Sequence, residues 1–467
     1  MDISERLSKF IDEHTDEMVA DTMKLCAVNS EKGAYEEGKP YGEGPFKALN
    51  EAMDLCEKYG FDVTNYDNYV AAVDMNDKES GLDILAHMDV VAAGDGWTVT
   101  EAYKPIVKDG RIYGRGTSDD KGPAMCALYA MRAVKELGLP LSRNCRLILG
   151  TDEECGSSDI KHYYAIEKEA PMTFSPDGEF PLINVEKGQF RGSITKSFDG
   201  KLKDRDFIYI KGGTTVNIVP GKAEAAVCGL PLSDILPHAK ELEEDTGVKF
   251  SFSENEGSVV IAAEGKGAHA STPENGKNAA IALCTLVAKL PLDESERRTA
   301  LLNFLELFPY GVNDGSGIGI KMSDQVSHAT TCSLDIFEMT EKELYAKWDA
   351  RTCASSNHEN CVEPAEKSVR EKGFDVETDF LPAHVVDGDS DFVKTLLACY
   401  EKYTGKKGEC LAIGGGTYVH ELKNGVAFGA VGDTTDTHMH GADEFMIIEE
   451  MKTAAKIYAE AIYELCK

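Results

Sequence analysis

His87 and Asp89 lie two residues apart near the end of an apolar run, residues 82–91. A run of this length is typical of a buried strand, in which alternate side chains point to the same face. An imidazole beside a carboxylate suits a metal site, because one group can bind the ion while the other orients the ring. The pair alone is equally consistent with a hydrogen-bonded histidine in a core, so its interpretation depends on the rest of the chain.

Further carboxylates and imidazoles follow along the chain: Asp119 with Asp120, Glu153 with Glu154, Asp177, and His438 with His440. Asp119 and Asp120 directly precede a helix predicted over residues 123–137, where the free amides and the helix dipole stabilise carboxylates. Simple N-capping explains one aspartate there more easily than two.

Glu153 and Glu154 follow a short apolar strand predicted over residues 145–151. Adjacent glutamates tend to point in different directions, so one can bind a metal while the other faces a water molecule. Taken alone, such a pair is more often a solvated acidic turn.

Together the five segments supply imidazoles and carboxylates without a thiolate, most of them at predicted strand ends of one sheet. Open α/β sheets bind their ligands at the carboxyl ends of the strands. This donor set suits zinc, manganese or cobalt and argues against a structural zinc finger. The surplus of carboxylates indicates two ions that share a bridging one.

Strands and helices alternate in the first third of the chain. The patterns predict helices over 2–28, 45–59 and 123–137 and strands over 70–75, 82–91, 145–151 and 172–175. This alternation is typical of an α/β protein with a mixed, mostly parallel sheet covered by helices.

The pattern changes after about residue 187, where alternating strands with Gly and Pro punctuation surround helical segments such as 279–289. Helices return over 391–404 and 447–465. We therefore expect a catalytic domain formed by residues 1–186 and 383–467, with an α+β domain inserted over 187–382.

The composition favours a cytoplasmic protein. A formal net charge of −32 over 467 residues argues against nucleic acid and anionic membranes as partners. No apolar stretch approaches the ~20 residues of a membrane span, and residues 1–6 lack the basic and apolar regions of a signal peptide. The 13 cysteines are scattered, without a Cys-x-x-Cys motif, as in a protein from a reducing compartment.

In this order, the motifs resemble those of the co-catalytic metallopeptidases, a family that includes aminoacylases, glutamate carboxypeptidases, succinyl-diaminopimelate desuccinylases and carnosinases. Residues 114–123, Gly-Arg-Gly-Thr-Ser-Asp-Asp-Lys-Gly-Pro, the chain length and the large insertion are most similar to the bacterial dipeptidase V branch. The resemblance covers essentially the whole chain. It implies a zinc-peptidase-like catalytic domain with an inserted lid domain.

The resemblance also implies a ligand set for two divalent ions, with Zn²⁺ expected and Mn²⁺ or Co²⁺ as alternatives. In this set His87 and Asp177 bind the first ion, Glu154 and His440 bind the second, Asp119 bridges both, and Asp89 orients His87. The Asp119–Asp120 bond would be a cis peptide. His440 is preferred to His438 because the family's ligand is followed four residues later by a glutamate, here Glu444.

Glu153 would be the general base. It would take a proton from a water held between the ions and return that proton to the leaving nitrogen. Burial and neighbouring carboxylates would raise the pKa of Glu153, while two cations would lower it, and the sequence leaves open which effect is larger.

The inserted domain would supply substrate contacts. His269 would stabilise the oxyanion, Asn217 would contact the same oxygen or the substrate carboxylate, and Arg351 would bind the C-terminal carboxylate of a short peptide. Gly415, Gly416 and Thr417 would meet the substrate through backbone amides. Without the resemblance, His269 and Arg351 are also consistent with ordinary surface residues. A long lid could replace a partner subunit, so we expect a monomer.

The sequence therefore predicts a di-metal dipeptidase acting on short unblocked dipeptides, including those with β-alanyl or D-configured N-terminal residues. The alternative with the same chemistry is an N-acyl amino acid deacylase. A catalytically dead metal- or peptide-binding protein is a different class of answer, but the presence of Glu153 argues against it. A pure interaction protein would leave the ordered ligands unexplained.

Overall fold

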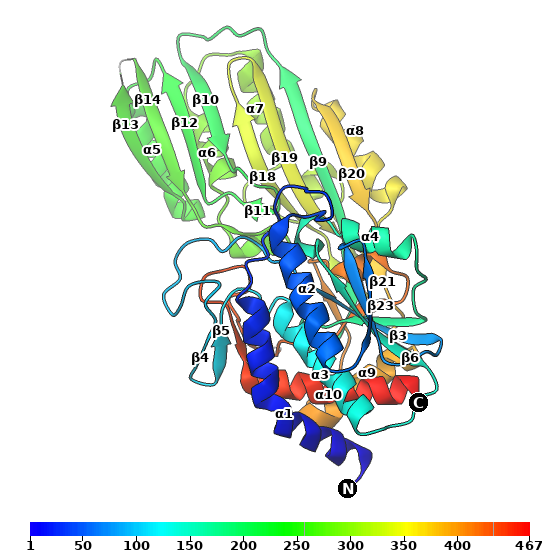
Figure 1. Cartoon of the computed structure of the whole chain (residues 1–467). Coiled ribbons are helices and arrows are strands. Elements are labelled where there is room, and N and C mark those ends of the chain that lie inside the picture. The colour runs from blue at the N-terminus through cyan, green and yellow to red at the C-terminus, as the bar shows by residue number, and fades with distance from the viewer. Residues whose placement is uncertain (256, 433) are drawn as a thin grey trace. The chain divides into compact units, whose positions relative to one another are not determined.

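The computed structural model describes residues 1–255, 257–432 and 434–467 and divides the chain into two compact units (Figure 1). Unit 1 comprises Met1–Val185, His384–Leu411 and Gly416–Lys467. Unit 2 comprises Glu186–Ala383 and Ala412–Gly415. Unit 1 is therefore assembled from segments that lie on both sides of unit 2 in the sequence.

The elements that begin in unit 1 are α1 (Ile3–Cys26), α2 (Glu43–Lys58), β1 (Asp62–Tyr66), β2 (Val70–Asp74), β3 (Ser80–His87), β4 (Ile106–Lys108), β5 (Arg111–Tyr113), α3 (Lys121–Glu136), β6 (Asn144–Gly150), η1 (Glu153–Cys155), α4 (Ser158–Tyr164), β7 (Met172–Ser175), β8 (Ile183–Glu186), β21 (His384–Val385), α9 (Asp391–Thr404), β22 (Leu411–Ile413), η5 (Tyr418–Glu421), β23 (Gly425–Ala427), β24 (Phe445–Ile447) and α10 (Ile448–Cys466). These bounds lie close to the helices and strands that the sequence predicts in this part of the chain.

The main sheet of unit 1 has the order β1-β2-β6-β3-β7-β23-β8-β21. At its centre β6, β3, β7 and β23 run parallel to one another, whereas β1–β2, β2–β6 and β23–β8 are antiparallel pairs. The mixed α/β architecture expected from the sequence is confirmed. Because the central strands are parallel, their carboxyl ends lie along one edge, which gathers the residues that follow them.

Both faces of this sheet are buried. Leu82, Ile84 and Ala86 of β3 belong to a core shared with α1, α3 and α10, while Leu85 points to the opposite face and packs in a smaller cluster with α4 and η5. The run is apolar on both faces for this reason, as is typical of a central parallel strand. His87 has the same parity as Leu85 and therefore points toward the α4 side.

Strand β3 ends at His87, four residues before the end of the predicted strand. The backbone still pairs at Met88, whose amide donates to Gly150, but the amide of Val90 donates to Ser30 instead. Asp89 thus lies in the turn after β3. Residues 88–90 are buried beyond the end of β3, where Val90 forms an isolated parallel bridge with Glu31.

The elements of unit 2 are β9 (Gly188–Ser197), β10 (Asp206–Gly212), β11 (Ile218–Val219), β12 (Lys222–Cys228), α5 (Leu232–Thr246), β13 (Lys249–Asn255), β14 (Ser258–Glu264), β15 (Ala268–His269), η2 (Pro273–Asn275), α6 (Ala279–Lys289), α7 (Glu296–Leu307), η3 (Ser316–Ile318), β16 (Ser323–Asp324), β17 (His328–Ala329), β18 (Thr331–Met339), β19 (Glu343–Thr352), η4 (His358–Val362), α8 (Glu363–Glu371) and β20 (Asp375–Leu381). Its main sheet is antiparallel and has the order β13-β14-β12-β10-β18-β19-β9-β20.

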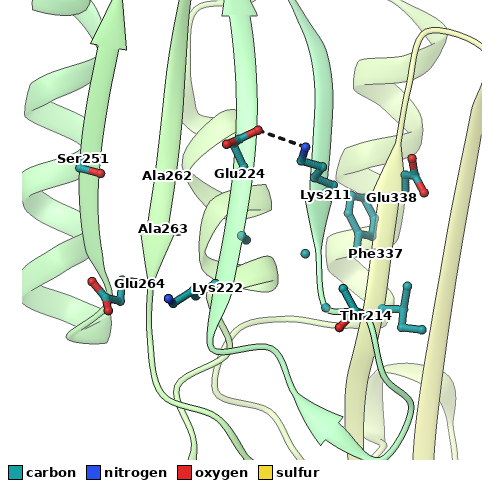
Figure 2. Close-up of a pocket in the computed structure, with 14 residues that line it drawn as sticks. Lys211, Thr214, Lys222, Glu224, Ser251, Ala262, Ala263, Glu264, Phe337 and Glu338 are labelled. Carbon is teal, nitrogen blue, oxygen red and sulfur yellow. Dashed lines mark ion pairs between the residues drawn. The ribbon is translucent and has the colours of Figure 1, made fainter. Parts of the chain in front are cut away.

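Helices α5, α6 and α7 cover one face of this sheet and enclose its core. The other face carries polar side chains and a groove over β14, β12, β10 and β18, where Lys211 and Glu224 form an ion pair of 3.2 Å (Figure 2). The residues that line this groove include none of the candidate site residues. Across the described residues, no helix combines the length and apolar character that a membrane crossing requires.

A substitution of Gly192 in β9 would test how tightly the core of unit 2 is packed. A methyl group at this position would overlap the indole of Trp348, which is fully buried in the core. We expect Gly192→Ala to lower the free energy of unfolding of unit 2 by about 1–3 kcal/mol, because the indole must leave its position. The chain has two tryptophans, so denaturant unfolding followed by fluorescence in a Trp97→Phe background reports on Trp348.

The neighbouring substitution Ser193→Ala is the matched control, since the side chain of Ser193 is less buried than Gly192 and points to the other face of β9. An equal loss of stability in both variants would contradict the packing argument.

Candidate metal centre and active site

The carboxylate of Asp119 lies between two imidazoles of unit 1. Its Oδ1 is 2.9 Å from Nε2 of His87, and its Oδ2 is 2.9 Å from Nε2 of His440. Each oxygen therefore faces a different ring, although the three residues are distant in the sequence. This is the arrangement of a carboxylate that bridges two cations.

The fold explains why these residues meet. His87 is the last residue of β3, and its Cα pairs with Gly150 at the end of β6. Asp119 precedes α3, which packs against α1 and α10. The segment that carries His440 is held beside Asp119 because β24, which follows it, pairs with β5 in a small three-stranded sheet.

Asp89 connects His87 with the turn that follows β6. Nδ1 of His87 lies 3.0 Å from the backbone oxygen of Asp89 and 3.4 Å from its Oδ1. The two carboxylate oxygens of Asp89 accept the amide N–H groups of Glu153 and Glu154, each at 3.2 Å. Asp89 thus orients the imidazole and also fixes the backbone that carries both glutamates.

The remaining carboxylates surround His87. Donor atoms of His87, Asp119 and Glu154 lie within 4.8 Å of one another, and so do those of His87, Glu153 and Asp177. Oδ2 of Asp177 is 3.8 Å from Nε2 of His87, and Oε2 of Glu154 is 3.5 Å from Nε2 of His440. The two glutamates therefore belong to different sets, as expected for adjacent residues in one turn.

The loop before α3 is held by a buried carboxylate from far along the chain. Glu444 accepts the amide N–H groups of Gly116 and Ser118 and forms a 2.7 Å ion pair with Arg115. Neither Arg115 nor this role of Glu444 was predicted, because the contact spans more than three hundred residues and leaves no local pattern. The loop geometry that presents Asp119 depends on it.

Asp120 does not cap α3 with its side chain. Its Oδ2 instead accepts the backbone N–H of His87 at 3.0 Å, so it ties the start of α3 to the end of β3. The peptide bond between Asp119 and Asp120 is cis, as the resemblance implied. N-capping therefore does not explain this pair of aspartates.

His438 lies apart from these contacts. Its ring packs 5.7 Å from that of Phe445, with which it forms an edge-to-face pair. Both His438 and His440 have positive φ angles, 57° and 62°, so the chain turns sharply between them. Of the two histidines, His440 is the one that the structure brings beside Asp119.

Burial in this cluster shifts several pKa values. Burial raises the pKa of the Glu153 carboxyl well above its usual range and, with the charge of Asp119, raises that of Asp177 to about 7. Burial lowers the pKa of His87, but hydrogen bonds to carboxylates outweigh burial and hold it well above its ordinary value. Hydrogen bonds to Asp119 and then Glu154 raise the pKa of His440 to about 11. Shifts in these directions are expected where several carboxylates and imidazoles crowd together and no cation is bound.

This cluster fits two divalent cations. Oε1 of Glu154 is buried and has no hydrogen-bond partner among the described residues, which is costly for a carboxylate unless a cation is bound. Imidazole nitrogens and carboxylate oxygens surround Asp119 on both sides without a cysteine, a donor set typical of zinc and similar ions.

Four candidate residues lie in unit 2, namely Asn217, His269, Arg351 and Gly415. A short pair of strands joins the segments that carry the first two. Asn217, with φ of 69°, donates its backbone N–H to Oδ2 of the buried Asp335 at 2.7 Å. Its carbonyl accepts the amide of Ala270 at 2.8 Å, and Ile218 pairs with His269. The backbones of Asn217 and His269 therefore form one structure anchored on Asp335, which the sequence did not single out.

Arg351 is buried in β19, and its guanidinium already donates hydrogen bonds to other residues of the chain. Its Nε and Nη2 donate to the two oxygens of Asp349 at 2.7 and 3.3 Å, and its Nη1 donates to the carbonyl of Gly414 at 2.6 Å. A guanidinium has five N–H donors, so two remain for a ligand. Arg351 thus also fixes the glycine-rich segment that contains Gly415.

Gly416 and Thr417 belong to unit 1, where Thr417 caps η5 by accepting the amide of Val419. The next residue, Tyr418, is buried, donates its hydroxyl to Asp159 and has its ring nearly perpendicular to that of His87. Asp159 also accepts the amides of Thr151 and Asp152 at the end of β6. Sequence reasoning missed Asp159, because a lone aspartate in a short helix gives no signal.

Comparison with known proteins identifies the class to which this site belongs. Residues 84–464 match peptidase family M20/M25/M40, and the chain belongs to this family. The protein is therefore a metal-dependent peptidase, and the family resemblance recognised from its motifs is confirmed.

Two relatives match nearly the whole chain. The putative dipeptidase YtjP of Bacillus subtilis is 33% identical over 459 residues, which cover 97% of this chain and 98% of that protein. The Beta-Ala-Xaa dipeptidase of Lactobacillus delbrueckii subsp. lactis is 34% identical over 460 residues, with coverage of 97% and 96%. The crystal structure of human carnosine dipeptidase 1 has the same fold, with a TM-score of 0.60, 15% identity and coverage of 100% and 99%.

The contacts of Asp89 generate a prediction about metal affinity. Asp89→Asn replaces one of the oxygens that accept the amides of the Glu153–Glu154 turn with an amino group, so we expect metal affinity to fall about 10–100-fold. Competition with a chromogenic chelator measures this affinity. Asp95→Asn, an exposed position, is the matched control. Equal affinity in both variants would contradict the orienting role of Asp89.

Proposed function

We propose that the protein is a dipeptidase that cleaves short unblocked dipeptides with the help of two divalent cations. The observation that carries this proposal is the Asp119 carboxylate, whose two oxygens face His87 and His440, with Glu153 near His87 and Asp177. The names of both relatives described above, each matching nearly the whole chain, support a dipeptide as substrate.

In this proposal His87 and Asp177 would hold one ion, Glu154 and His440 would hold the other, and Asp119 would contribute to both. When bound, the ions would polarise the scissile carbonyl and lower the pKa of water. Zn²⁺ is the ion we propose, because two imidazoles with carboxylates and no thiolate suit a catalytic zinc site, while Mn²⁺ and Co²⁺ accept the same donors.

Glu153 serves as the general base. Its carboxylate takes a proton from the attacking water and returns it to the amine that leaves, so that it ends each turnover in its starting state. Burial raises the pKa of the Glu153 carboxyl, and bound cations would lower it again. The amide of Glu153 is held by Asp89, which keeps the carboxylate in position.

Unit 2 supplies the remaining substrate contacts and acts as a lid. His269 and Asn217 donate hydrogen bonds to the carbonyl oxygen as its negative charge develops, since pre-positioned donors stabilise this charge. Arg351 binds the C-terminal carboxylate with its two remaining N–H groups, and the amides of Gly415, Gly416 and Thr417 border the substrate. Recognition of a free carboxylate would place the scissile bond next to the C-terminal residue of the substrate.

We further propose that the protein acts as a monomer in the cytoplasm. Unit 2 already contains a complete eight-stranded sheet with its own core, which supports a lid that needs no partner subunit. All thirteen cysteines are free, and most are buried, as is typical of proteins from a reducing compartment. Light scattering of the purified protein measures its mass against the 50.9 kDa of one chain.

Glu153→Ala tests the assignment of the base. We expect the variant to retain its metal content while kcat falls by at least about 10²–10⁴-fold, because the proton acceptor is lost and the five proposed ligands remain. Elemental analysis of the purified protein and steady-state kinetics give the two quantities. Glu57→Ala, on the exposed surface of α2, is the matched control. Turnover that survives in Glu153→Ala would contradict the assignment.

The substrate class is tested with a panel of dipeptides beside N-acetyl and N-succinyl amino acids. Chelation should abolish amino acid release from dipeptides, and addition of Zn²⁺, Mn²⁺ or Co²⁺ should restore it, because the buried carboxylates need a cation. Chromatographic detection of free amino acids gives the rate for each substrate. Hydrolysis of the acylated compounds with no release from dipeptides would favour a deacylase instead.

A further inference from the structure

Ser271 contacts His269 through two different groups. The backbone N–H of Ser271 donates to Nδ1 of His269 at 3.2 Å, and the Oγ of Ser271 lies 2.6 Å from the same nitrogen. Both contacts are made within the Ala268–Ser271 segment of unit 2, so they do not depend on any other part of the chain. Two potential donors thus converge on one ring nitrogen.

These contacts favour one protonation state of the ring. An amide N–H can only donate, so Nδ1 must offer its lone pair, and an unprotonated Nδ1 in a neutral imidazole leaves the proton on Nε2. The Ser271 hydroxyl then donates to Nδ1 as well. In the other tautomer, or in the imidazolium, an N–H at Nδ1 would face the N–H of Ser271, which is unfavourable.

We propose that Ser271 is a positioning residue that holds His269 as the neutral tautomer protonated at Nε2. This tautomer presents an N–H donor from the far side of the ring, which is the group that an oxyanion requires. The oxyanion role of His269 rests on the proposed function, whereas the tautomer is argued from the contacts with Ser271.

The backbone around Ser271 is held on both sides, which makes it a suitable support for the ring. The carbonyl of Ser271 accepts the hydroxyl of Thr331 at 3.3 Å, and the amide of Ala270 donates to Asn217 at 2.8 Å. Gly414 packs so closely that a Cβ there would lie 2.7 Å from the Cβ of Ser271. The carbonyl of Gly414 in turn accepts a hydrogen bond from Arg351.

Ser271 therefore lies where the proposed oxyanion donors and the proposed carboxylate clamp meet within unit 2. His269 depends on its side chain, Asn217 is bonded to the residue before it, and the segment bonded to Arg351 packs against it. A substitution at Ser271 should therefore lower kcat, because it changes the position of His269.

The experiment compares kcat and KM of the full-length, metal-loaded protein as wild type, Ser271→Ala, Ser271→Thr, His269→Ala and the double variant Ser271→Ala/His269→Ala. We expect His269→Ala to lower kcat about 10²–10³-fold, with metal content preserved. Ser271→Ala should lower kcat about 3–10-fold, the effect of losing one hydrogen bond to the ring, with little change in KM. Ser271→Thr, which keeps the hydroxyl, should retain most of the activity.

The double variant distinguishes positioning from a general structural effect. If Ser271 acts through His269, Ser271→Ala should cause no further loss in the His269→Ala background. An equal loss in both backgrounds, or full activity of Ser271→Ala in the wild-type background, would overturn the proposal. Ser251→Ala, an exposed serine of β13, controls for loss of a hydroxyl elsewhere in unit 2.

A second measurement does not require activity. Nitrogen-15 NMR of histidine-labelled protein, with the His269 signals assigned by their loss in His269→Ala, distinguishes protonated from unprotonated ring nitrogens. We expect a protonated Nε2 and an unprotonated Nδ1, and a proton on Nδ1 at neutral pH would overturn the proposal. If the wild type releases no amino acids from dipeptides, the proposed function fails, while this spectrum still decides the tautomer.

Discussion

The carboxylate of Asp119 is the centre around which the imidazoles and carboxylates of unit 1 are arranged. Its two oxygens face Nε2 of His87 and Nε2 of His440, so it divides the cluster into a buried half at His87 and a half at His440, whose side chain is 55% exposed. Further carboxylates complete each half, and one oxygen of Glu154 has no partner among the described residues. Several buried acids so close together would repel one another unless positive charge were shared between them. Bound cations would relieve this repulsion.

Three other carboxylates shape the site without being proposed as ligands. Asp89 accepts the amides of the Glu153–Glu154 turn, Glu444 accepts those of the loop before Asp119, and Asp159 accepts those at the end of β6. Charge-assisted hydrogen bonds from backbone amides are stronger than neutral ones and hold irregular loops in one conformation. The site is thus built from loops, but these loops are fixed by buried anions.

Much of the fold could be predicted because it depends on local patterns. The apolar runs of β3 and β6 mark buried parallel strands, and residues just after such strands gather at one sheet edge, which is where His87 and Glu154 lie. The roles of Glu444 and Asp159 could not be predicted in the same way. Each depends on contacts between segments that are distant in the sequence, and a single acidic residue in a loop or short helix carries no periodic signal.

The choice between His438 and His440 illustrates the same limit. The two histidines are only two residues apart, so the sequence around them is nearly the same. Their positive φ angles, which point the rings in different directions, depend on the turn in the folded chain. In unit 2, Asp335 was overlooked because an aspartate within an apolar strand does not reveal which amide it accepts. Family resemblance supplied what local pattern could not, since it carries information about which distant segments meet.

The discontinuous construction of unit 1 has a consequence for biosynthesis. Strand β7 pairs with β3 on one side and with β23 on the other, and β23 is translated about two hundred and fifty residues later. A ribosome therefore completes all of unit 2 while one edge of β7 still lacks the backbone partners that β23 supplies. Exposed strand edges promote aggregation during synthesis. Nascent chains of this protein should thus depend on molecular chaperones until the last eighty residues emerge.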